Sequence, residues 1–414
     1  MKTDRIPSLL KTLARNAATV AFLTAISTTT PAGAADTDST RTASRFISHV
    51  GLDLRGAYVG SSTSALRDAG YYGTGPKELH SDISAHMKYS FSYSPSSRLG
   101  RLYPGAYQGV GLSLTSFFDK SRIGSPVGVY VFQGASIFRL APRLTFDYEW
   151  NFGASFGWEK YQKDNPRTNL IVGSGTNAYI NVGFMLRYCL SSNIALAAGI
   201  DMTHWSNGNT SWPNPGVNAI GGRAGLIYTF DSRASMQTLA DMQETEPVRP
   251  HFSYDLVVYG AARKRMLHIN DSPQLLPGRF GIAGLNFAPM YNFNRFLRAG
   301  ISADIQYDES SGLAGYWVEG TYDDDIKFRR PDFFHQVSAG LSARGELVMP
   351  IFSINAGLGY NLIGNHDTRN FYQVLALKVN VWHSLFLHVG YQLNSFRNPN
   401  NLMIGLGYRF HDLR

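Results

Sequence analysis

Residues 144–158 read LTFDYEWNFGASFGW, an unbroken alternation of apolar and polar side chains. Side chains alternate between the two faces of a β-strand, so this segment is a strand with one largely aromatic face and one mostly polar face. Strands of a soluble β-sandwich are usually about 5–6 residues long, whereas a long strand with an aromatic face is typical of a tilted membrane strand. The segment therefore favours a transmembrane antiparallel β-barrel over a sandwich, and predicts an all-β fold.

The same pattern recurs along the chain in two groups of eight segments. The first group is 46–60, 81–95, 105–118, 126–140, 144–158, 177–190, 194–206 and 217–230. The second is 251–263, 278–292, 296–307, 333–348, 350–362, 371–381, 384–396 and 400–410. Tight connections such as 141–143 alternate with long ones such as 159–176. Bacterial barrels have short periplasmic turns and longer external loops, so the segment 194–206 is expected to end on the external side.

The two groups resemble copies of one unit. Residues 225–230 read GLIYTF and residues 405–410 read GLGYRF, at the ends of the two groups. Aligning Gly199 with Gly390 places Ser395 opposite His204 and Arg397 opposite Ser206. We expect a signal peptide at 1–34, a first half at 43–232, a periplasmic linker at 233–250 and a second half at 251–414.

Four inward-facing charged residues leave the number of barrels open. Asp147, Glu149, Arg187 and Arg223 would pair inside a filled eight-stranded barrel or line the wall of a wider one. Since a single chain most simply inserts once, one sixteen-stranded barrel is slightly favoured over two small barrels.

Composition and the N-terminus indicate export. A basic start, an apolar core at 17–26 and the small residues Ala32-Gly33-Ala34 form a secretory signal. The net charge of +8 is scattered, without a basic run, and supports no nucleic-acid binding. Past the signal, no segment has the roughly 18 apolar residues of a membrane helix, so membrane spanning would be by strands. We expect a Gram-negative outer membrane location, with the lipid bilayer and the barrel-insertion machinery as partners.

The sequence supports neither an internal disulfide nor a bound metal or cofactor. The single Cys189 excludes an internal disulfide and is expected to be a free residue of an apolar core. The histidines are scattered without metal-ligand spacing, so we expect neither a metal site nor a cofactor.

The segment 194–206 ends its apolar face with two polar residues. Ile194, Leu196, Ala198, Ile200 and Met202 share that face, and His204 and Ser206 follow on it. Asn218 opens the next strand on the lipid-facing parity. Polar residues grouped on a lipid-facing surface are costly and are usually functional. Ordinary interface residues remain the alternative to a functional site.

These side chains suit ester hydrolysis. Ser206 would be the nucleophile, His204 the general base and Asn218 the group that orients the imidazole. Asn207, with backbone N–H groups at Gly208 and Asn209, would stabilise the oxyanion. The alternative is that Asn-Gly here is a turn signal only.

The string His204-Trp205-Ser206-Asn207 followed by Pro213-Asn214-Pro215-Gly216 resembles the outer-membrane lipid A 3-O-deacylase family, also called acyloxyacyl hydrolase-like. The resemblance covers about residues 43–232 and is specific around the motif. It implies a serine esterase that releases the 3-linked acyl chain of lipid A in lipopolysaccharide, without a metal, with His204 as base, Ser206 as nucleophile and Asn207 near the oxyanion. Family members place a Glu where this chain has Asn218, and the second half is a further departure.

A second resemblance is to outer-membrane phospholipase A. That family also has a His-x-Ser-Asn-Gly string, with an Asn twelve residues after the Ser, as Asn218 follows Ser206 here. It depends on calcium and carries an Arg where this chain has Asn209, so the deacylase is favoured. The third possibility is a porin-like structural barrel with a vestigial dyad.

Overall fold

The computed structural model describes residues 46–60, 79–162, 169–230, 249–269, 272–318, 321, 326–365, 368–396 and 398–412. The expected signal peptide and most of the expected linker lie outside these residues. Among the described residues, no helix is both long and apolar enough to cross a membrane.

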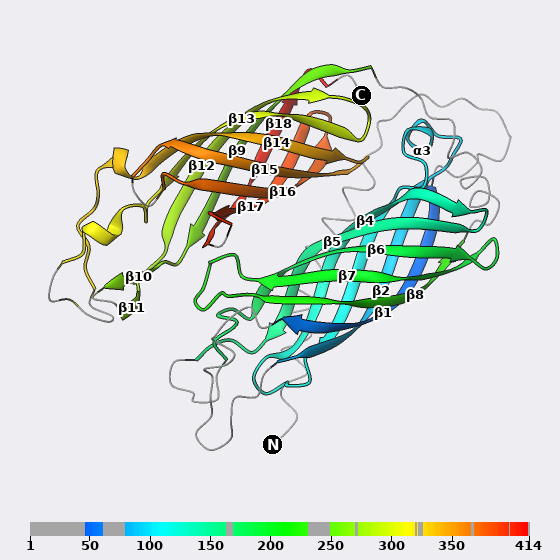
Figure 1. The fold of residues 1–414 in the computed structure, drawn as a ribbon, viewed down its shortest axis with the longest axis horizontal. Helices are drawn as coiled ribbons and strands as arrows, with labels where there is room; N and C mark the ends of the chain where they lie inside the picture. Colours follow the sequence, from blue (N-terminus) through cyan, green and yellow to red (C-terminus); the bar gives the residue numbers. More distant parts are fainter. Residues whose placement is uncertain are drawn as a thin grey trace. The chain divides into compact units, whose positions relative to one another are not determined.

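The first half forms a closed antiparallel barrel in the order β1 to β8 (Figure 1). Its strands are β1 Phe46–Gly60, β2 Ser81–Tyr93, β3 Tyr107–Ser116, β4 Gly124–Ala141, β5 Leu144–Trp158, β6 Thr176–Cys189, β7 Ile194–Ser206 and β8 Val217–Thr229. β8 pairs with β1, with Thr229 opposite His49, and this pairing closes the sheet. A short helix, α3 (Arg98–Leu102), interrupts the connection between β2 and β3, and the Ser97 hydroxyl caps it by accepting from the N–H of Gly100.

The second half forms its own closed barrel, in which β18 pairs back to β9. Its strands are β9 His251–Arg263, β12 Phe280–Asn292, β13 Leu297–Asp308, β14 Val337–Val348, β15 Phe352–Ile363, β16 Phe371–Trp382, β17 Leu385–Asn394 and β18 Asn398–Phe410. A separate hairpin, β10 (Met266–Ile269) with β11 (Ser272–Leu275), lies between β9 and β12. Two 3-10 helices, η2 (Leu313–Gly315) and η4 (Phe333–His335), lie between β13 and β14.

The all-β barrel prediction is confirmed, and the preference for one wide barrel is wrong. Each half closes through its own first and last strand, as the pairs His49–Thr229 and Tyr254–Phe410 show. Eight strands enclose an interior just wide enough for side chains to fill, so each barrel can bury its inward residues without the other.

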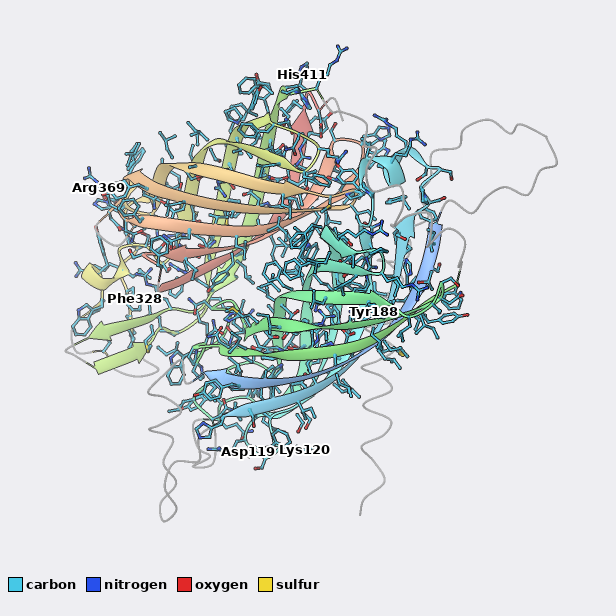
Figure 2. The ribbon with its side chains drawn as sticks, turned by 45° about the vertical axis from the view of Figure 1, so that its right-hand side comes forward. Asp119, Lys120, Tyr188, Phe328, Arg369 and His411 are labelled. Atoms are coloured by element: carbon cyan, nitrogen blue, oxygen red, sulfur yellow. The ribbon has the colours of Figure 1, made fainter. Side chains whose placement is uncertain are left out.

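Each barrel has a turn end and a loop end. In the first barrel β4–β5 and β6–β7 are joined at the turn end by connections of two to four residues, whereas β1–β2, β5–β6 and β7–β8 are joined at the loop end by longer ones. Figure 2 labels Asp119 and Lys120 at the loop end of this barrel and Tyr188 at its turn end. His204 and Ser206 lie at the loop end.

Paired charges fill the first lumen. Lys88 Nζ lies 2.8 Å from an Asp53 oxygen and 3.1 Å from a Glu149 oxygen. An Arg223 nitrogen lies 3.0 Å from Glu149, and Arg187 lies 2.8 Å from Asp147. The four charged residues expected to face inward do so. Buried charges are tolerated when they are paired in this way.

The second lumen repeats the arrangement with different residues. Lys378 Nζ lies 2.7 Å from Glu346 and 2.8 Å from Asp255, and Arg409 lies 2.8 Å from Asp255. Arg298 contacts both carboxylates. The two networks use different positions on their strands.

Candidate active site

Trp205 fixes which residues at the end of β7 face outward. Its side chain is buried in the lumen, at 5.4 Å from the Phe117 ring and 6.1 Å from the Trp158 ring between centroids. Because side chains alternate along a strand, burial of Trp205 turns His204 and Ser206 to the outer face. On this face the preceding residues Ile200 and Met202 are exposed. The dyad therefore continues the lipid-facing side of the strand.

Asn218 orients the imidazole of His204. The two residues are opposite each other in the β7–β8 ladder, and His204 Nδ1 lies 2.7 Å from Asn218 Oδ1. An amide oxygen only accepts hydrogen bonds, so Nδ1 carries the proton and Nε2 is the basic nitrogen. This is the tautomer that a general base requires.

Ser206 lies on the same face, two residues further along β7. Two residues of a strand span about 6–7 Å, so their side chains meet only if they lean toward each other. Within the described part of the chain, the Ser206 hydroxyl makes no side-chain hydrogen bond. Such contacts are often long before substrate binds. The arrangement has a serine hydroxyl and an imidazole on the same face of β7, without a hydrogen bond between them.

Asn207 builds the loop that follows the dyad. Its backbone N–H donates to Asn214 Oδ1 at 2.8 Å, and its own Oδ1 accepts from the Ser211 N–H at 3.3 Å. The Thr210 hydroxyl donates to the Asn207 carbonyl at 2.8 Å. The Asn207 side chain and backbone N–H therefore already have hydrogen-bond partners within the loop. The sequence had suggested instead that Asn207 would stabilise an oxyanion.

Gly208 and Asn209 continue this loop in left-handed conformations, with φ of +63° and +65°. Among the described residues, the Gly208 N–H has no hydrogen-bond acceptor. Of the residues expected near an oxyanion, Gly208 therefore offers a backbone donor that the loop does not use.

A second segment at the loop end supports this loop. The Gly173 N–H donates to the Pro213 carbonyl at 2.8 Å, and the Tyr161 and Trp212 rings meet edge to face at 5.0 Å. Asn169, which is buried, shapes the segment. Its amide donates to the Glu159 carbonyl at 2.6 Å, and its oxygen accepts from the N–H groups of Ile171 and Val172.

Gly216 closes the loop against His204. Its φ is +77°, and a Cβ placed there would lie 2.9 Å from His204 Cε1. Sequence reasoning missed Gly216, Asn214, Gly173 and Asn169 as supporting residues. The Pro-Asn-Pro-Gly string was the one signal in the sequence. The partners of these residues are distant in sequence or in another loop, so no local pattern could reveal the contacts.

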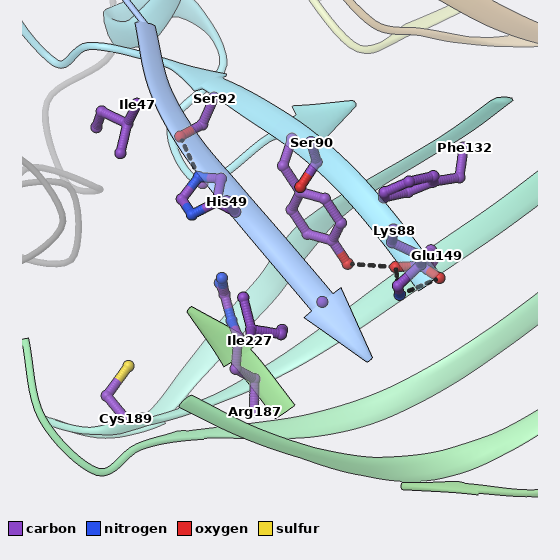
Figure 3. Close-up of a pocket in the computed structure, with 13 residues that line it drawn as sticks. Ile47, His49, Lys88, Ser90, Ser92, Phe132, Glu149, Arg187, Cys189 and Ile227 are labelled. Atoms are coloured by element: carbon purple, nitrogen blue, oxygen red, sulfur yellow. Dashed lines mark hydrogen bonds and ion pairs between the residues drawn. The ribbon is translucent and has the colours of Figure 1, made fainter. Parts of the chain in front are cut away.

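A cavity of about 70 Å³ lies in the lumen of the first barrel (Figure 3), and His204, Ser206 and Asn218 are not among the residues that line it. His49, Lys88, Glu149 and Arg187 line it near the turn end. Cys189 also lines it and is partly exposed, so the expectation of a packed apolar core cysteine is wrong. The reason is that Cys189 ends β6 on the lumen-facing parity, where the barrel opens.

The second barrel lacks a counterpart of this site in the described residues. Ser395, with φ of +51°, lies in the short connection between β17 and β18, where the first barrel has the ten-residue loop 207–216. Arg397 lies outside the described residues. Among the described residues of both barrels, no group of His, Cys, Asp and Glu could hold a metal ion.

Two family models match the chain. Residues 84–226 match the model described as lipid A 3-O-deacylase (PagL), and residues 252–412 match the model described as acyloxyacyl hydrolase, C-terminal domain. The second half, which the sequence presented as a departure from the family, thus has a family model of its own. The matched ranges together cover most of the chain, including His204, Ser206 and Asn218, but they leave out β1.

Three of the solved structures that are similar to the chain are an outer membrane enzyme, an outer membrane channel and a porin. The outer membrane enzyme PagL is 13% identical over 42% of this chain and 97% of its own, with a TM-score of 0.28. An outer membrane channel from Pseudomonas putida F1 is 12% identical over 91% and 99%, with a TM-score of 0.18. A mutant of the Rh. blastica porin is 8% identical over 88% and 100%, with a TM-score of 0.15. No curated protein matches the chain significantly.

Proposed function

Because the chain belongs to the outer-membrane lipid A 3-O-deacylase (PagL) family, we propose that it is a serine esterase that removes an ester-linked acyl chain from lipid A. The observation that carries the proposal is the hydrogen bond between His204 Nδ1 and Asn218 Oδ1, beside Ser206 on the lipid-facing side of β7. It prepares a base next to a nucleophile where a membrane lipid can reach both.

The reaction follows from the tautomer of His204. Nε2 takes the proton of the Ser206 hydroxyl as Oγ attacks the ester carbonyl carbon, and a tetrahedral intermediate forms. Nε2 then gives the proton to the departing sugar oxygen, which leaves an acyl-serine. Water, activated by the same nitrogen, hydrolyses this ester and releases the fatty acid.

The Gly208 N–H is our proposed donor to the oxyanion. It directly follows the Ser206-Asn207 pair, and the loop leaves it without an acceptor. Asn207 and Asn214 act through the loop shape, since their contact fixes the backbone from which the donor projects. A preorganised donor of this kind contributes about 2.7–4 kcal/mol to catalysis in other hydrolases.

The loop end of the first barrel is proposed to face the external leaflet. Long connections gather there, as they do on the outside of bacterial barrels. This orientation presents Ser206 to the leaflet that contains lipopolysaccharide.

A phospholipase A-like hydrolase is the second candidate, because His204, Ser206 and Asn218 form a His-Ser-Asn set. The two candidates are separated by mass spectrometry of lipids incubated with wild-type or Ser206→Ala protein. Lipid A and phospholipids are supplied separately, each with and without a chelator. Loss of one acyl chain from lipid A with wild type alone, in both conditions, is the expected result.

Chelator-sensitive lysophospholipid would instead identify the phospholipase. Identical products from wild-type and Ser206→Ala protein would overturn the serine-esterase proposal and favour a structural barrel.

A further inference from the structure

The second barrel presents two exposed phenyl rings at its loop end. Phe333 and Phe334 belong to η4, directly before β14, and 62% and 85% of their surfaces are exposed. The rings contact each other edge to face at 5.8 Å. Adjacent exposed aromatic rings are unfavourable in water and favourable among acyl chains.

Phe333 extends the lipid-facing wall of the barrel. Tyr307 shares the outer face of β13 with the exposed Ile301 and Ile305, and Phe333 stacks on it with ring centroids 5.5 Å apart. The Tyr307 hydroxyl donates to Gln336 Oε1 at 3.1 Å. The ring pair therefore lies where the wall meets the headgroup region, the level at which barrels carry aromatic girdles.

The segment that carries the rings is held in place. Gln336 is buried, and its amide donates to the Glu309 carbonyl at 2.7 Å. Asn365 donates to the His335 carbonyl at 2.8 Å, and the Arg329 N–H donates to the Tyr316 carbonyl at 2.8 Å. Because the backbone is fixed on both sides, little ordering is needed before a ligand binds.

Two exposed arginines precede the rings. Arg330 lies 3.3 Å from Glu309, and their side chains are 73% and 38% exposed. An ion pair in contact with water contributes little, so a phosphate can replace Glu309 as the partner. Arg329 is exposed beside it. Guanidinium groups suit phosphate because they donate two parallel hydrogen bonds.

Another cation lies at the same end of the barrel. Arg369, which is also exposed, is labelled there together with Phe328 in Figure 2. The acidic residues Asp323, Asp324 and Asp325 lie outside the described residues.

We propose that Arg329, Arg330, Phe333 and Phe334, here called the aromatic–arginine rim, bind a lipid A molecule of the outer leaflet. The arginines would hold a phosphate while the rings contact acyl chains. The site is on the second barrel and contains none of the catalytic residues. The choice of lipid A rests on the proposed function, whereas the need for a phosphate and acyl chains comes from the rim itself.

The test counts bound lipids by native mass spectrometry of full-length Ser206→Ala protein in detergent. The protein is mixed with lipid A, with dephosphorylated lipid A or with phosphatidylethanolamine. The rim is altered by Arg329→Gln/Arg330→Gln or by Phe333→Ser/Phe334→Ser. The matched control is Arg139→Gln/Arg143→Gln, which removes two exposed arginines near the turn end of the first barrel. Heat-modifiable gel mobility verifies that each variant is folded.

We expect each rim variant to lose one bound lipid A, with occupancy of that site at least fivefold lower, and the control to retain it. Lipid A should bind at least fivefold better than its dephosphorylated form. Equal lipid A counts in rim variants and control, or equal binding of phosphatidylethanolamine, would overturn the proposal.

The two proposals fail separately in this design. If lipid A binds at the rim but the Ser206-containing protein does not deacylate it, the rim proposal holds and the esterase proposal is overturned. If the protein deacylates lipid A and the rim variants bind lipid A as well as before, the esterase proposal holds and the rim proposal is overturned.

Discussion

Asn218 lies at the position where the sequence resemblance leads us to expect a glutamate. Its neutral amide can orient the imidazole of His204 but cannot stabilise a positive charge on it. It fixes the proton on His204 Nδ1 through a 2.7 Å contact. In the proposed mechanism it offers no negative charge to the imidazolium that would form when Nε2 takes the Ser206 proton. Hydrogen bonds to an ionised partner are roughly twice as strong as those between neutral groups. Orientation is therefore retained here without charge stabilisation.

Two substitutions of Asn218 separate these contributions. Asn218→Ala should lower kcat for acyl release about tenfold or more, because the imidazole loses the partner that fixes its tautomer. Asn218→Glu should raise kcat several-fold, because a carboxylate stabilises the imidazolium. Initial rates of fatty-acid release from lipid A provide the measurement, with Ser206→Ala as the zero. An Asn218→Ala enzyme as fast as wild type would show that the residue does not hold the base.

At the scale of elements, the strands were predictable and the loops were not. The ranges 144–158, 194–206 and 251–263 coincide with β5, β7 and β9, since alternation over a lipid-facing strand is continuous. The helix α3 has only five residues, too few to show helical periodicity, and was missed. The hairpin of β10 with β11 was missed as well, because two four-residue strands show little alternation.

The site shows the same division. The shared parity of His204, Ser206 and Asn218 predicts that they lie on one outer face, and the structure places His204 opposite Asn218 there. The contacts of Asn169, Gly173 and Asn214 depend on how two loops fold onto each other. No local pattern encodes such a contact.

A pair of glycines in one loop tests whether this packing matters. A Cβ at Gly173 would lie 2.2 Å from the Trp212 carbonyl oxygen, whereas at Gly175 the nearest atom is 3.7 Å away. Gly173→Ala should displace loop 207–216, and misplacement by about 1 Å can cost up to about 100-fold in rate. Gly175→Ala is the matched control and should retain near wild-type kcat/KM. Comparable activity of the two variants, both folded by gel mobility, would mean that the loops do not support each other during catalysis.

For the whole molecule, closure was the property that sequence left open. Inward charges at alternate positions look the same in a filled small barrel and in the wall of a wide one. What decides is whether β8 pairs with β1 or with β9. The first pairing joins residues that are 180 positions apart, as in His49–Thr229, whereas the second would join strands that are neighbours in the chain. The structure has the former, so each barrel contains its own buried charge network.

Separate networks should give separate stabilities. Glu149 and Glu346 are both buried and each contacts several cations, so the substitution of either by Gln leaves cations without a full counter-charge. Breaking a buried pair in this way costs about 3–5 kcal/mol. Denaturant unfolding in micelles, followed both by spectroscopy and by residual esterase activity, distinguishes the barrels.

Glu149→Gln should lower the denaturant concentration at which activity is lost, because the proposed active site is in the first barrel. Glu346→Gln should lower the midpoint of a spectroscopic transition and leave the activity midpoint in place. An equal shift of the activity midpoint by both variants would show that the barrels unfold as one cooperative unit. In that case the two barrels, although each is closed by its own strand pairing, would not have separate free energies of unfolding.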